Sequence, residues 1–438
     1  MFLISLQIYI LYFKLFIFFL IYLKNNYMNM NKLILTQIIK NEEHIISRWL
    51  DSVKDIVDGI VIVDTGSTDN SVKDVKEWGK KNKIDTHVFE REFDNFENSR
   101  NFSMEKAREI YLNKDNHTYY GFWLDADEVI QVGPTFDKQK LNRDIYMFNT
   151  HIGSMKYTRN ELYRLDKSFK FWGPVHEFIV PSDSKEKLTS GLCEGIDVIV
   201  RMDGGSWKEE TAKKYRKHAN ILEDYIDNVD RDPRWIFYTA QSYHDSSSLV
   251  GNEPENHERL RRALKYYTER LGHNSGYVEE RFYAQFRIGT ITYRLQRPFE
   301  EVEEQLLKAY RIDPLRGEPF SVLIEHYQQQ SDWNMAYMYS NFAYNTYHNN
   351  NPYPNRVLFL DSKLYEWKFL ELYANSCYHT GRKDVGRKLY LELTSILDKF
   401  PNKFDENDRK RINTNKTFFL QQEQNVLQKP SKITPPMR

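Results

Sequence analysis

Short apolar runs alternate with amphipathic stretches between residues 33 and 128, and this alternation is the feature that most constrains the fold. The apolar runs predict four strands, over 33–39, 59–63, 87–89 and 120–124. The stretches between them predict helices over 42–53, 70–81 and 98–110. A strand-helix-strand order of this kind predicts a doubly wound, mainly parallel sheet.

Polar clusters follow three of these strands at the point where each strand ends. They occupy residues 40–43, 64–69 and 125–128. Ligands of doubly wound sheets bind beyond the carboxyl ends of the strands. We therefore expect the three clusters to converge on one edge of the sheet and to form the functional site.

Asp125 and Asp127 form the sharpest of these features, an Asp-x-Asp after the apolar run 122–124. Their carboxylates are hard oxygen ligands of the kind that Mg2+ and Mn2+ prefer, often together with the phosphates of a substrate. The alternative is a solvated acidic turn. The buried strand in front of the pair favours a metal site.

Asp64 follows its strand in the same way, and its carboxylate could accept hydrogen bonds from a base or a ribose. Capping of the next helix by residues 67–69 is the alternative, and both roles are compatible. Asn41 and Glu42 after the first strand are a weaker signal, which alone would mark a helix start. Arg100, early in the third helix, could meet a phosphate, or it could be an exposed helix arginine.

His176 and Glu177 follow a Gly173-Pro174 turn, which would hold the pair on a loop. A histidine can complete a metal shell, and an adjacent carboxylate can act as a general base. A histidine next to a glutamate is by itself a weak signal, so a purely structural role stays open.

Several function classes lack their sequence signatures. No Gly-x-Gly-x-x-Gly follows any strand, and the chain has neither a Walker phosphate loop nor a Gly-x-Ser-x-Gly elbow. Lys+Arg and Asp+Glu both number 62, so the overall charge does not favour nucleic acid as a partner. The two cysteines, Cys193 and Cys377, have no metal-ligand spacing and indicate reduced, buried thiols.

The chain becomes Tyr-rich and helical beyond about residue 205. Candidate helices, separated by Gly and Pro, cover 234–243, 259–271, 280–295, 301–312, 321–327, 333–344, 365–378 and 385–397. Paired helices at this density indicate a helical repeat region, with a plain helical bundle as the alternative. The polar segment 401–438 predicts a disordered tail.

Residues 2–23 are almost entirely apolar and long enough to span a bilayer. Two explanations compete. The segment is a real anchor with the folded domain on the cytosolic side, or the start of translation is mis-set and the domain begins near Met28 or Met30. The expected location is therefore cytoplasmic, with membrane association only if residues 2–23 form an anchor.

Five segments in order resemble the family 2 glycosyltransferases with a GT-A fold. They are 36–43 (TQIIKNEE), 62–69 (IVDTGSTD), 98–101 (NSRN), 123–128 (WLDADE) and 169–177 (FKFWGPVHE). The resemblance is to the bacterial branch in which a helical, often tetratricopeptide-like region follows the catalytic domain. Together with the apolar start and the polar end of the chain, it predicts a hydrophobic N-terminal segment over 1–29, a GT-A domain over 30–205, a helical domain over 206–400 and a tail over 401–438.

The resemblance also implies roles for the residues singled out above. Asn41, Glu42 and Asp64 would line the site of the nucleotide-sugar donor, UDP-linked in our expectation, with Asp64 on the nucleoside and Arg100 near the nucleotide. Asp125 would contact ribose and a divalent cation, Mn2+ or Mg2+, and Asp127 would hold that cation on the diphosphate, with His176 as a further ligand. Glu177 would be the base of an inverting transfer.

One departure from the family pattern bears on activity. Relatives often carry a His-x-Gly-Tyr segment after the catalytic domain, whereas this chain has Met202 at the position of that histidine. An inactive relic that serves as a helical-repeat scaffold is therefore the alternative to an active enzyme, and a nucleotidyltransferase is a third hypothesis. The expected partners are the donor, a glycan, lipid or peptide acceptor, and a protein bound at the helical repeats.

Overall fold

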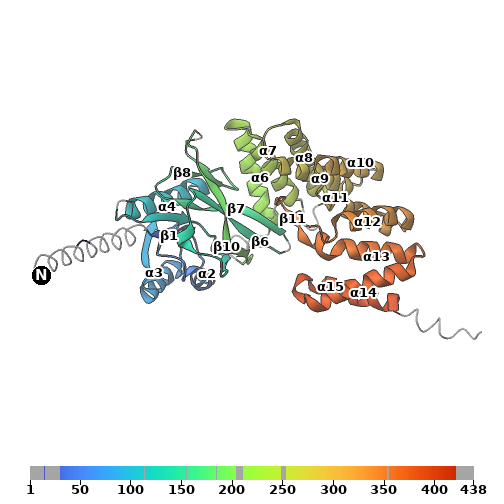
Figure 1. Cartoon of the computed structure of the whole chain (residues 1–438). Helices are drawn as coiled ribbons and strands as arrows, with labels where there is room; N and C mark the ends of the chain where they lie inside the picture. The colour runs from blue at the N-terminus through green and yellow to red at the C-terminus, as the bar shows by residue number, and fades with distance from the viewer. Residues whose placement is uncertain are drawn as a thin grey trace, which may run out of the picture. The chain divides into compact units, whose positions relative to one another are not determined.

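A computed structural model describes residues 14, 30–112, 114–153, 155–183, 185–203, 211–247, 253–352 and 355–420. The chain divides into two compact units (Figure 1). Unit 1 comprises residues 1–153 and 157–230, and unit 2 comprises residues 154–156 and 231–438. The predicted fold class, an α/β GT-A domain followed by an all-α domain, is confirmed, while the predicted boundary near residue 205 stays a prediction.

Unit 1 contains the predicted strands and helices and several further strands. Its strands are β1 (Asn31–Ile39), β2 (Gly59–Asp64), β3 (Asp85–Glu90), β4 (Thr118–Phe122), β5 (Glu128–Val132), β6 (Ile145–Ile152), β7 (Met155–Arg164), β8 (Phe169–Trp172), β9 (Phe178–Pro181) and β10 (Ser190–Val200). Its helices are α2 (Ile46–Val53), α3 (Ser71–Asn82), α4 (Phe96–Tyr111), the 3-10 turn η1 (Lys138–Lys140) and α6 (Thr211–Asn228).

The main sheet has the strand order β3-β2-β1-β4-β7-β6-β10-β5. Strands β3, β2, β1 and β4 are parallel, as helical crossovers require. The sheet is mixed beyond β4, because β7 runs antiparallel to β4 and β5 runs antiparallel to β10. Strands β8 and β9 form a separate antiparallel pair. The carboxyl ends of β1, β2 and β4 therefore lie at one edge, as predicted.

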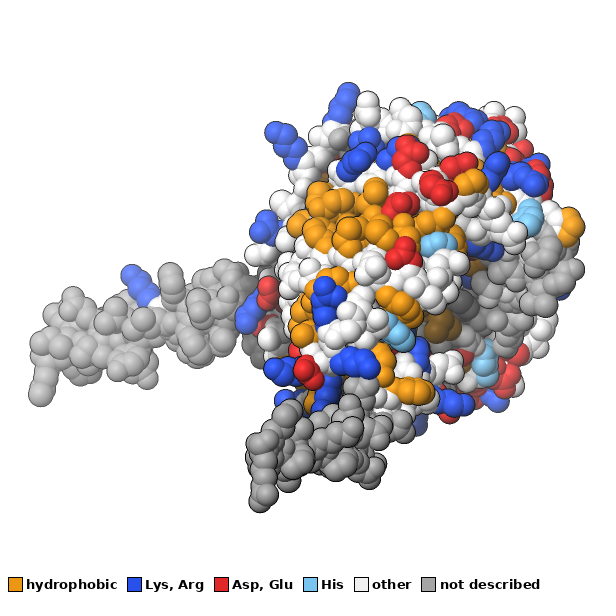
Figure 2. Space-filling view, turned by 90° about the vertical axis from the view of Figure 1, so that its right-hand side faces the viewer, with side chains coloured by type: hydrophobic (Ala, Val, Ile, Leu, Met, Phe, Trp, Pro, Cys, Tyr) orange, Lys and Arg blue, Asp and Glu red, His pale blue; other side chains and the backbone are white. Residues whose placement is uncertain are grey.

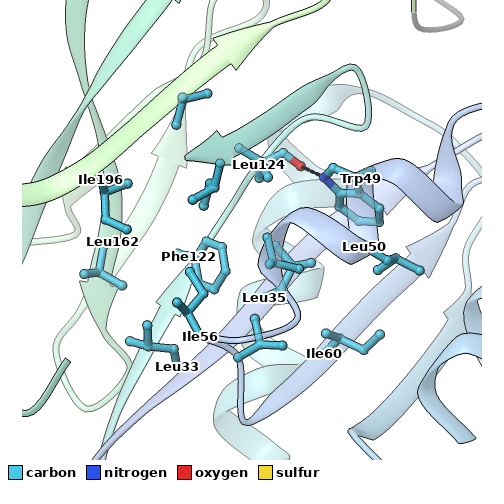
Figure 3. Close-up of a cluster of buried hydrophobic side chains, with 14 of the residues drawn as sticks. Leu33, Leu35, Trp49, Leu50, Ile56, Ile60, Phe122, Leu124, Leu162 and Ile196 are labelled. Carbon is cyan, nitrogen blue, oxygen red and sulfur yellow. Dashed lines mark hydrogen bonds between the residues drawn. The ribbon is translucent and has the colours of Figure 1, made fainter. Parts of the chain in front are cut away.

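Two apolar cores cover the two faces of this sheet, since alternate residues of a strand point to opposite faces. Ile60 and Ile62 of β2 join Trp49 of α2 and Trp78 of α3 in one core. Val61 points to the other face, where α4 packs. In the first core the Trp49 indole donates a 3.1 Å hydrogen bond to the carbonyl of Leu124 (Figure 3), which ties α2 to the chain directly after β4.

Unit 2 is built almost entirely of helices that follow one another along the chain. They are α7 (Pro233–Asp245), α8 (Glu253–Gly272), α9 (Val278–Arg294), α10 (Phe299–Ile312), α11 (Glu318–Gln329), α12 (Trp333–Tyr347), the π-helical turn η2 (Leu364–Lys368), α13 (Phe369–His379), α14 (Lys383–Lys399), the 3-10 turn η3 (Pro401–Lys403) and α15 (Glu406–Leu420), with a short strand β11 (Leu360–Asp361). Figure 2 shows one face of the molecule, on which apolar side chains gather among charged ones.

Close helix contacts in unit 2 depend on two glycines. A Cβ at Gly289 of α9 would lie 2.7 Å from Cδ2 of Leu306 on α10. A Cβ at Gly386 of α14 would lie 2.8 Å from the carbonyl oxygen of Ala374 on α13. These helix pairs therefore approach more closely than larger residues would allow.

The predicted tail begins too early. Residues 401–403 form a 3-10 turn and Glu406–Leu420 form α15. Phe404, Ile412 and Phe419 are buried in the last apolar core of unit 2, which outweighs the polar composition that predicted disorder. The predicted segment 2–23 lies outside the described residues apart from Lys14. No helix in the described part of the chain has the length and apolar character needed to span a membrane.

Candidate active site

Arg100 is the centre of the candidate site. It lies on α4 and is buried, with only 6% of the residue exposed. Its Nε donates to Glu177 Oε1 at 2.7 Å, its Nη2 to Asp125 Oδ1 at 2.8 Å, and its Nη1 to Gln37 Oε1 at 2.8 Å. One guanidinium thus joins two predicted functional carboxylates from distant parts of the chain, and the alternative of an exposed helix arginine is wrong.

The turn after β4 carries Asp125 and Asp127 and is fixed by main-chain bonds. The Glu128 amide donates to the Asp125 carbonyl at 2.9 Å, and the Arg201 amide donates to the Asp127 carbonyl at 2.8 Å. The Asp125 side chain is 36% exposed. Burial alone would raise the pKa of Asp125, but Arg100 and Arg159 outweigh it and lower the pKa, so this carboxyl is ionised at neutral pH.

Trp123 lies between two guanidiniums directly before this turn. The centre of its ring is 4.5 Å from Cζ of Arg100 and 4.4 Å from Cζ of Arg159. Strand β7 holds the tryptophan as well, because its indole donates to the Asn160 carbonyl at 3.1 Å and its amide donates to the Glu161 carbonyl at 3.2 Å. Stacked cations of this kind favour a single orientation of the ring.

Arg159 connects β7 to the Asp125 turn through Glu128. Its Nη2 donates to both Glu128 oxygens, at 2.9 and 2.8 Å, and its Nε donates to Glu161 at 2.6 Å. Glu128 Oε2 in turn accepts the Asp125 amide at 3.0 Å. The turn that bears the Asp-x-Asp pair is therefore supported from one side by Arg100 and from the other by Arg159.

Arg159 is the shared ion-pair partner of two buried carboxylates, Glu128 and Glu161. Because they share one positive charge, its attraction does not fully offset the effect of burial on their pKa values. Burial raises the pKa of Glu161 to about 8 and that of Glu128 to about 7, and the attraction of Arg159 offsets this only in part. Glu161 Oε2 has no hydrogen-bond partner within the described part of the chain. The pair therefore favours holding a proton near neutral pH.

Replacing Glu161 by Gln should change how stability depends on pH. The pKa of Glu161 is raised on folding, so folding takes up a proton between about pH 5 and about pH 8, and stability falls as the pH rises through this window. Gln cannot ionise, so we expect the variant to gain stability relative to the wild type as the pH rises, by at most about 1.4 kcal/mol per pH unit. Melting temperatures at pH 5, 6, 7 and 8 measure this, with the exposed Glu109→Gln as control. Parallel curves for E161Q and the wild type would contradict the assignment.

The segment 171–177 brings Glu177 to Arg100. Asn101 of α4 fixes its start, accepting from the Phe171 amide at 2.8 Å and donating to the Phe171 carbonyl at 3.0 Å. Glu97 of the same helix accepts from the Gly173 amide at 3.0 Å. The Glu177 side chain is 10% exposed. His176, by contrast, points its ring at His218 of α6, with ring centres 5.5 Å apart.

The loops after β1 and β2 are tied to each other. The Asp64 carboxylate accepts from the amides of Gly66, at 3.3 Å, and Ser67, at 3.1 Å. The Asn41 side chain accepts from the Thr68 amide at 2.7 Å, and the Glu42 amide donates to Ser71 Oγ at 2.7 Å. Asp64 therefore orders its own loop, while the N-cap of α3 is Asn70, which makes no side-chain cap hydrogen bond. The contact of Asp64 with a nucleoside stays a prediction.

The chain after β10 is fixed on α2. Arg48 donates to both oxygens of Asp203, at 2.6 and 2.7 Å, and the His44 ring lies 2.9 Å from the Asp203 carbonyl oxygen. This bidentate bond, with a further contribution from the charge of Asp127, raises the pKa of Arg48. Met202, in the position of the family histidine, is 46% exposed. The Asp203 carboxylate is thus engaged with Arg48.

The sequence did not single out three side chains of this network. Gln37 lies within a quoted segment, and its Nε2 donates to the Leu124 carbonyl at 2.6 Å and to Asp125 Oδ1 at 3.0 Å. Arg159 and Glu161 lie in a region without motifs. The one available signal was the spacing of Arg159 and Glu161, which are two residues apart and therefore on one face of a strand. The same strand contains the buried Leu162.

Comparison with known proteins finds one family match and two curated relatives. Residues 38–171 match the model of the family described as Glycosyl transferase family 2. Two curated relatives, the SPbeta prophage-derived glycosyltransferase SunS of Bacillus subtilis (strain 168) and glycosyltransferase SunS of Bacillus phage SPbeta, are each 22% identical over 241 residues, 52% of this chain and 52% of theirs. The chain thus matches about half the length of these relatives.

Two solved structures are similar to parts of the chain. One is S. aureus TarS 1–349 in complex with UDP-GlcNAc, with 14% identity and a TM-score of 0.33 over 61% of this chain and 93% of that one. The other is MamA, with 10% identity and a TM-score of 0.32 over 45% of this chain and 97% of that one.

The α/β domain, with an Asp-x-Asp turn at the carboxyl end of a central strand, has the GT-A fold class. Within this domain, residues 38–171 are similar to glycosyl transferase family 2.

Proposed function

We propose that the protein transfers a sugar from a nucleotide-sugar donor to a hydroxyl or thiol of a glycan, lipid or peptide acceptor. The observation that carries this proposal is the junction of Arg100 with Asp125 and Glu177 at the carboxyl edge of the sheet. It places the candidate cation-binding turn and the candidate base within reach of one guanidinium. A UDP-linked donor is the one that the family resemblance favours.

The protein residues fit a divalent cation only if the substrate supplies some of the ligands. Within the described residues no group of three His, Cys, Asp or Glu side chains could hold a metal. Mg2+ and Mn2+ commonly use one or two carboxylates and complete their shell with substrate phosphates and water. Asp125 and Asp127 would supply such carboxylates, and the partly exposed Asp125 side chain agrees with that role. His176 would not be needed, since its ring packs on His218.

The proposed mechanism assigns one task to each residue. Asp64 binds the nucleoside, with Asn41 and Glu42 ordering the loop around it. The cation, when bound, offsets the charge that develops on the departing nucleoside diphosphate. Glu177 takes the proton from the acceptor hydroxyl as that oxygen attacks the anomeric carbon, and the configuration inverts. Arg100 holds Glu177 and Asp125 at a fixed position relative to each other. In this mechanism the main task of the protein is to orient its two substrates.

A thermal-shift screen tests donor binding directly. We expect at least one of the UDP-, GDP- or dTDP-sugars to raise the melting temperature with Mn2+ present, because a ligand that binds only the folded state stabilises it, by about 2.7 kcal/mol at a hundred times its Kd. The shift should shrink when EDTA replaces Mn2+, which is the matched control. If no nucleotide sugar shifts the melting temperature in either buffer, the enzyme proposal fails.

Met202 stands at the position of the family histidine and is exposed. This replacement is the reason to test the scaffold hypothesis as well as the enzyme hypothesis. A scaffold would bind no donor in calorimetry, whereas a transferase would. A nucleotidyltransferase would instead release pyrophosphate from a nucleoside triphosphate. The proposed protein partner of the helical unit stays a prediction under either hypothesis.

A further inference from the structure

Helix α6 contacts the segment that carries Glu177. The ring of His218 meets the ring of His176 edge-on, with centres 5.5 Å apart and planes at 89°. About two turns further along the helix, the hydroxyl of Tyr225 accepts a hydrogen bond from the side chain of Trp172. Both contacts lie within unit 1, which extends to Asp230. Helix α6 therefore belongs to the unit that holds the candidate site.

The backbone of this segment is strained at the residue that α6 contacts. His176 has φ = 57°, in the left-handed region that side chains with a Cβ rarely adopt. Such a conformation is unfavourable and persists only where the surroundings determine it. Helix α4 supplies one set of restraints through Glu97, Arg100 and Asn101. The edge of His218 supplies another, at His176 itself.

We propose that α6 is a positioning element of the active site, in which His218 and Tyr225 hold the segment 171–177 so that Glu177 faces the acceptor. This inference rests on the proposed role of Glu177 as the base. His218 and Tyr225 act through His176 and Trp172 and not on the substrate. Loss of either contact lets His176 relax towards negative φ, which turns the neighbouring Glu177 away from Arg100 and from the reacting hydroxyl.

Hydrogen exchange and kinetics on the full chain test the proposal. The variants are His218→Ala, Tyr225→Phe and their combination, with Ile221→Ala, an exposed residue of the same helix, as control. We expect faster amide exchange over 171–177 in the first three, and a fall of roughly tenfold in kcat for nucleotide-sugar hydrolysis, because misplacing a catalytic group is costly. The KM for the nucleotide sugar should stay within about twofold, since the donor loops are untouched.

A conservative variant separates positioning from loss of fold. His218→Phe keeps an aromatic ring against His176 and should restore exchange and kcat towards the wild type. Unchanged exchange over 171–177 in the double variant overturns the proposal whatever the activity. Faster exchange with wild-type kcat overturns the catalytic part. If the wild type hydrolyses no nucleotide sugar, the proposed function fails, while the exchange measurement still decides whether α6 holds the segment.

Discussion

Asp127→Ala should lower the rate of nucleotide-sugar hydrolysis by about a hundredfold or more and leave the fold intact. The rate falls because Asp127 is the residue proposed to hold the cation on the diphosphate, and the cation supplies several kcal/mol of transition-state stabilisation. The fold persists because the turn is held by main-chain bonds from Arg201 to Asp127 and from Glu128 to Asp125, which an alanine at 127 retains. Initial rates with Mn2+ and the melting temperature measure the two effects.

The control is Asp55→Ala, which removes an exposed carboxylate from unit 1 at no candidate site. It should keep the wild-type rate. A titration with Mn2+ adds a second criterion, because weakened binding of the cation raises the concentration needed for half-maximal activity. A wild-type rate in Asp127→Ala, or a wild-type enzyme indifferent to EDTA, would show that the carboxylate pair does not bind a catalytic cation.

The first half of unit 1 could be predicted because local pattern and global fold agree there. The β-branched run at 60–63 is buried on both faces, and the helices on either side have one apolar face each. The polar clusters after β1, β2 and β4 lie at one edge of the sheet because these strands are parallel. For these reasons the pattern of apolar runs and polar junctions was enough to place the carboxylates of the candidate site at one sheet edge.

Helices α6 and α15 show where the pattern was too weak. The buried face of α6 contains two alanines, Ala212 and Ala219, beside Leu222 and Ile226, so its apolar periodicity is shallow. In α15 the buried apolar residues are Ile412 and Phe419, among mostly polar neighbours. An ion pair between Arg411 and the buried Glu371 supports the helix further, through a contact between residues 40 positions apart that no local pattern reveals.

The support of the Asp-x-Asp turn was also beyond prediction, for a different reason. Arg159, Glu128 and Glu161 are charged, and charged residues are ordinarily exposed. Here Glu128 and Glu161 are buried and the Arg159 side chain is only 21% exposed, because these three residues of β5 and β7 compensate one another. Whether a charge in a sequence is buried depends on partners that only the tertiary fold brings near, so composition misleads most at such networks.

Arg100→Met should destabilise unit 1 by about 3–5 kcal/mol and abolish nucleotide-sugar hydrolysis. The loss is large because removing one partner of a buried pair leaves the other charge uncompensated, and here two carboxylates, Asp125 and Glu177, lose the same cation. Arg100→Lys should recover only part of the stability, since one ammonium cannot reproduce a planar group that donates to three acceptors. Urea unfolding gives the global effect, and hydrogen exchange of α4 and β4 amides assigns it to unit 1.

A double-mutant cycle distinguishes a coupled site from independent contacts. Lys106→Met removes the ion-pair partner of the exposed Glu109 on the same helix and should cost less than about 1 kcal/mol. Adding Glu177→Gln to Arg100→Met should return part of the lost stability, because one of the two stranded charges disappears. Strictly additive costs would mean that Arg100 and Glu177 do not depend on each other. The candidate base and the Asp-x-Asp turn would then lack the common support on which the proposed geometry depends.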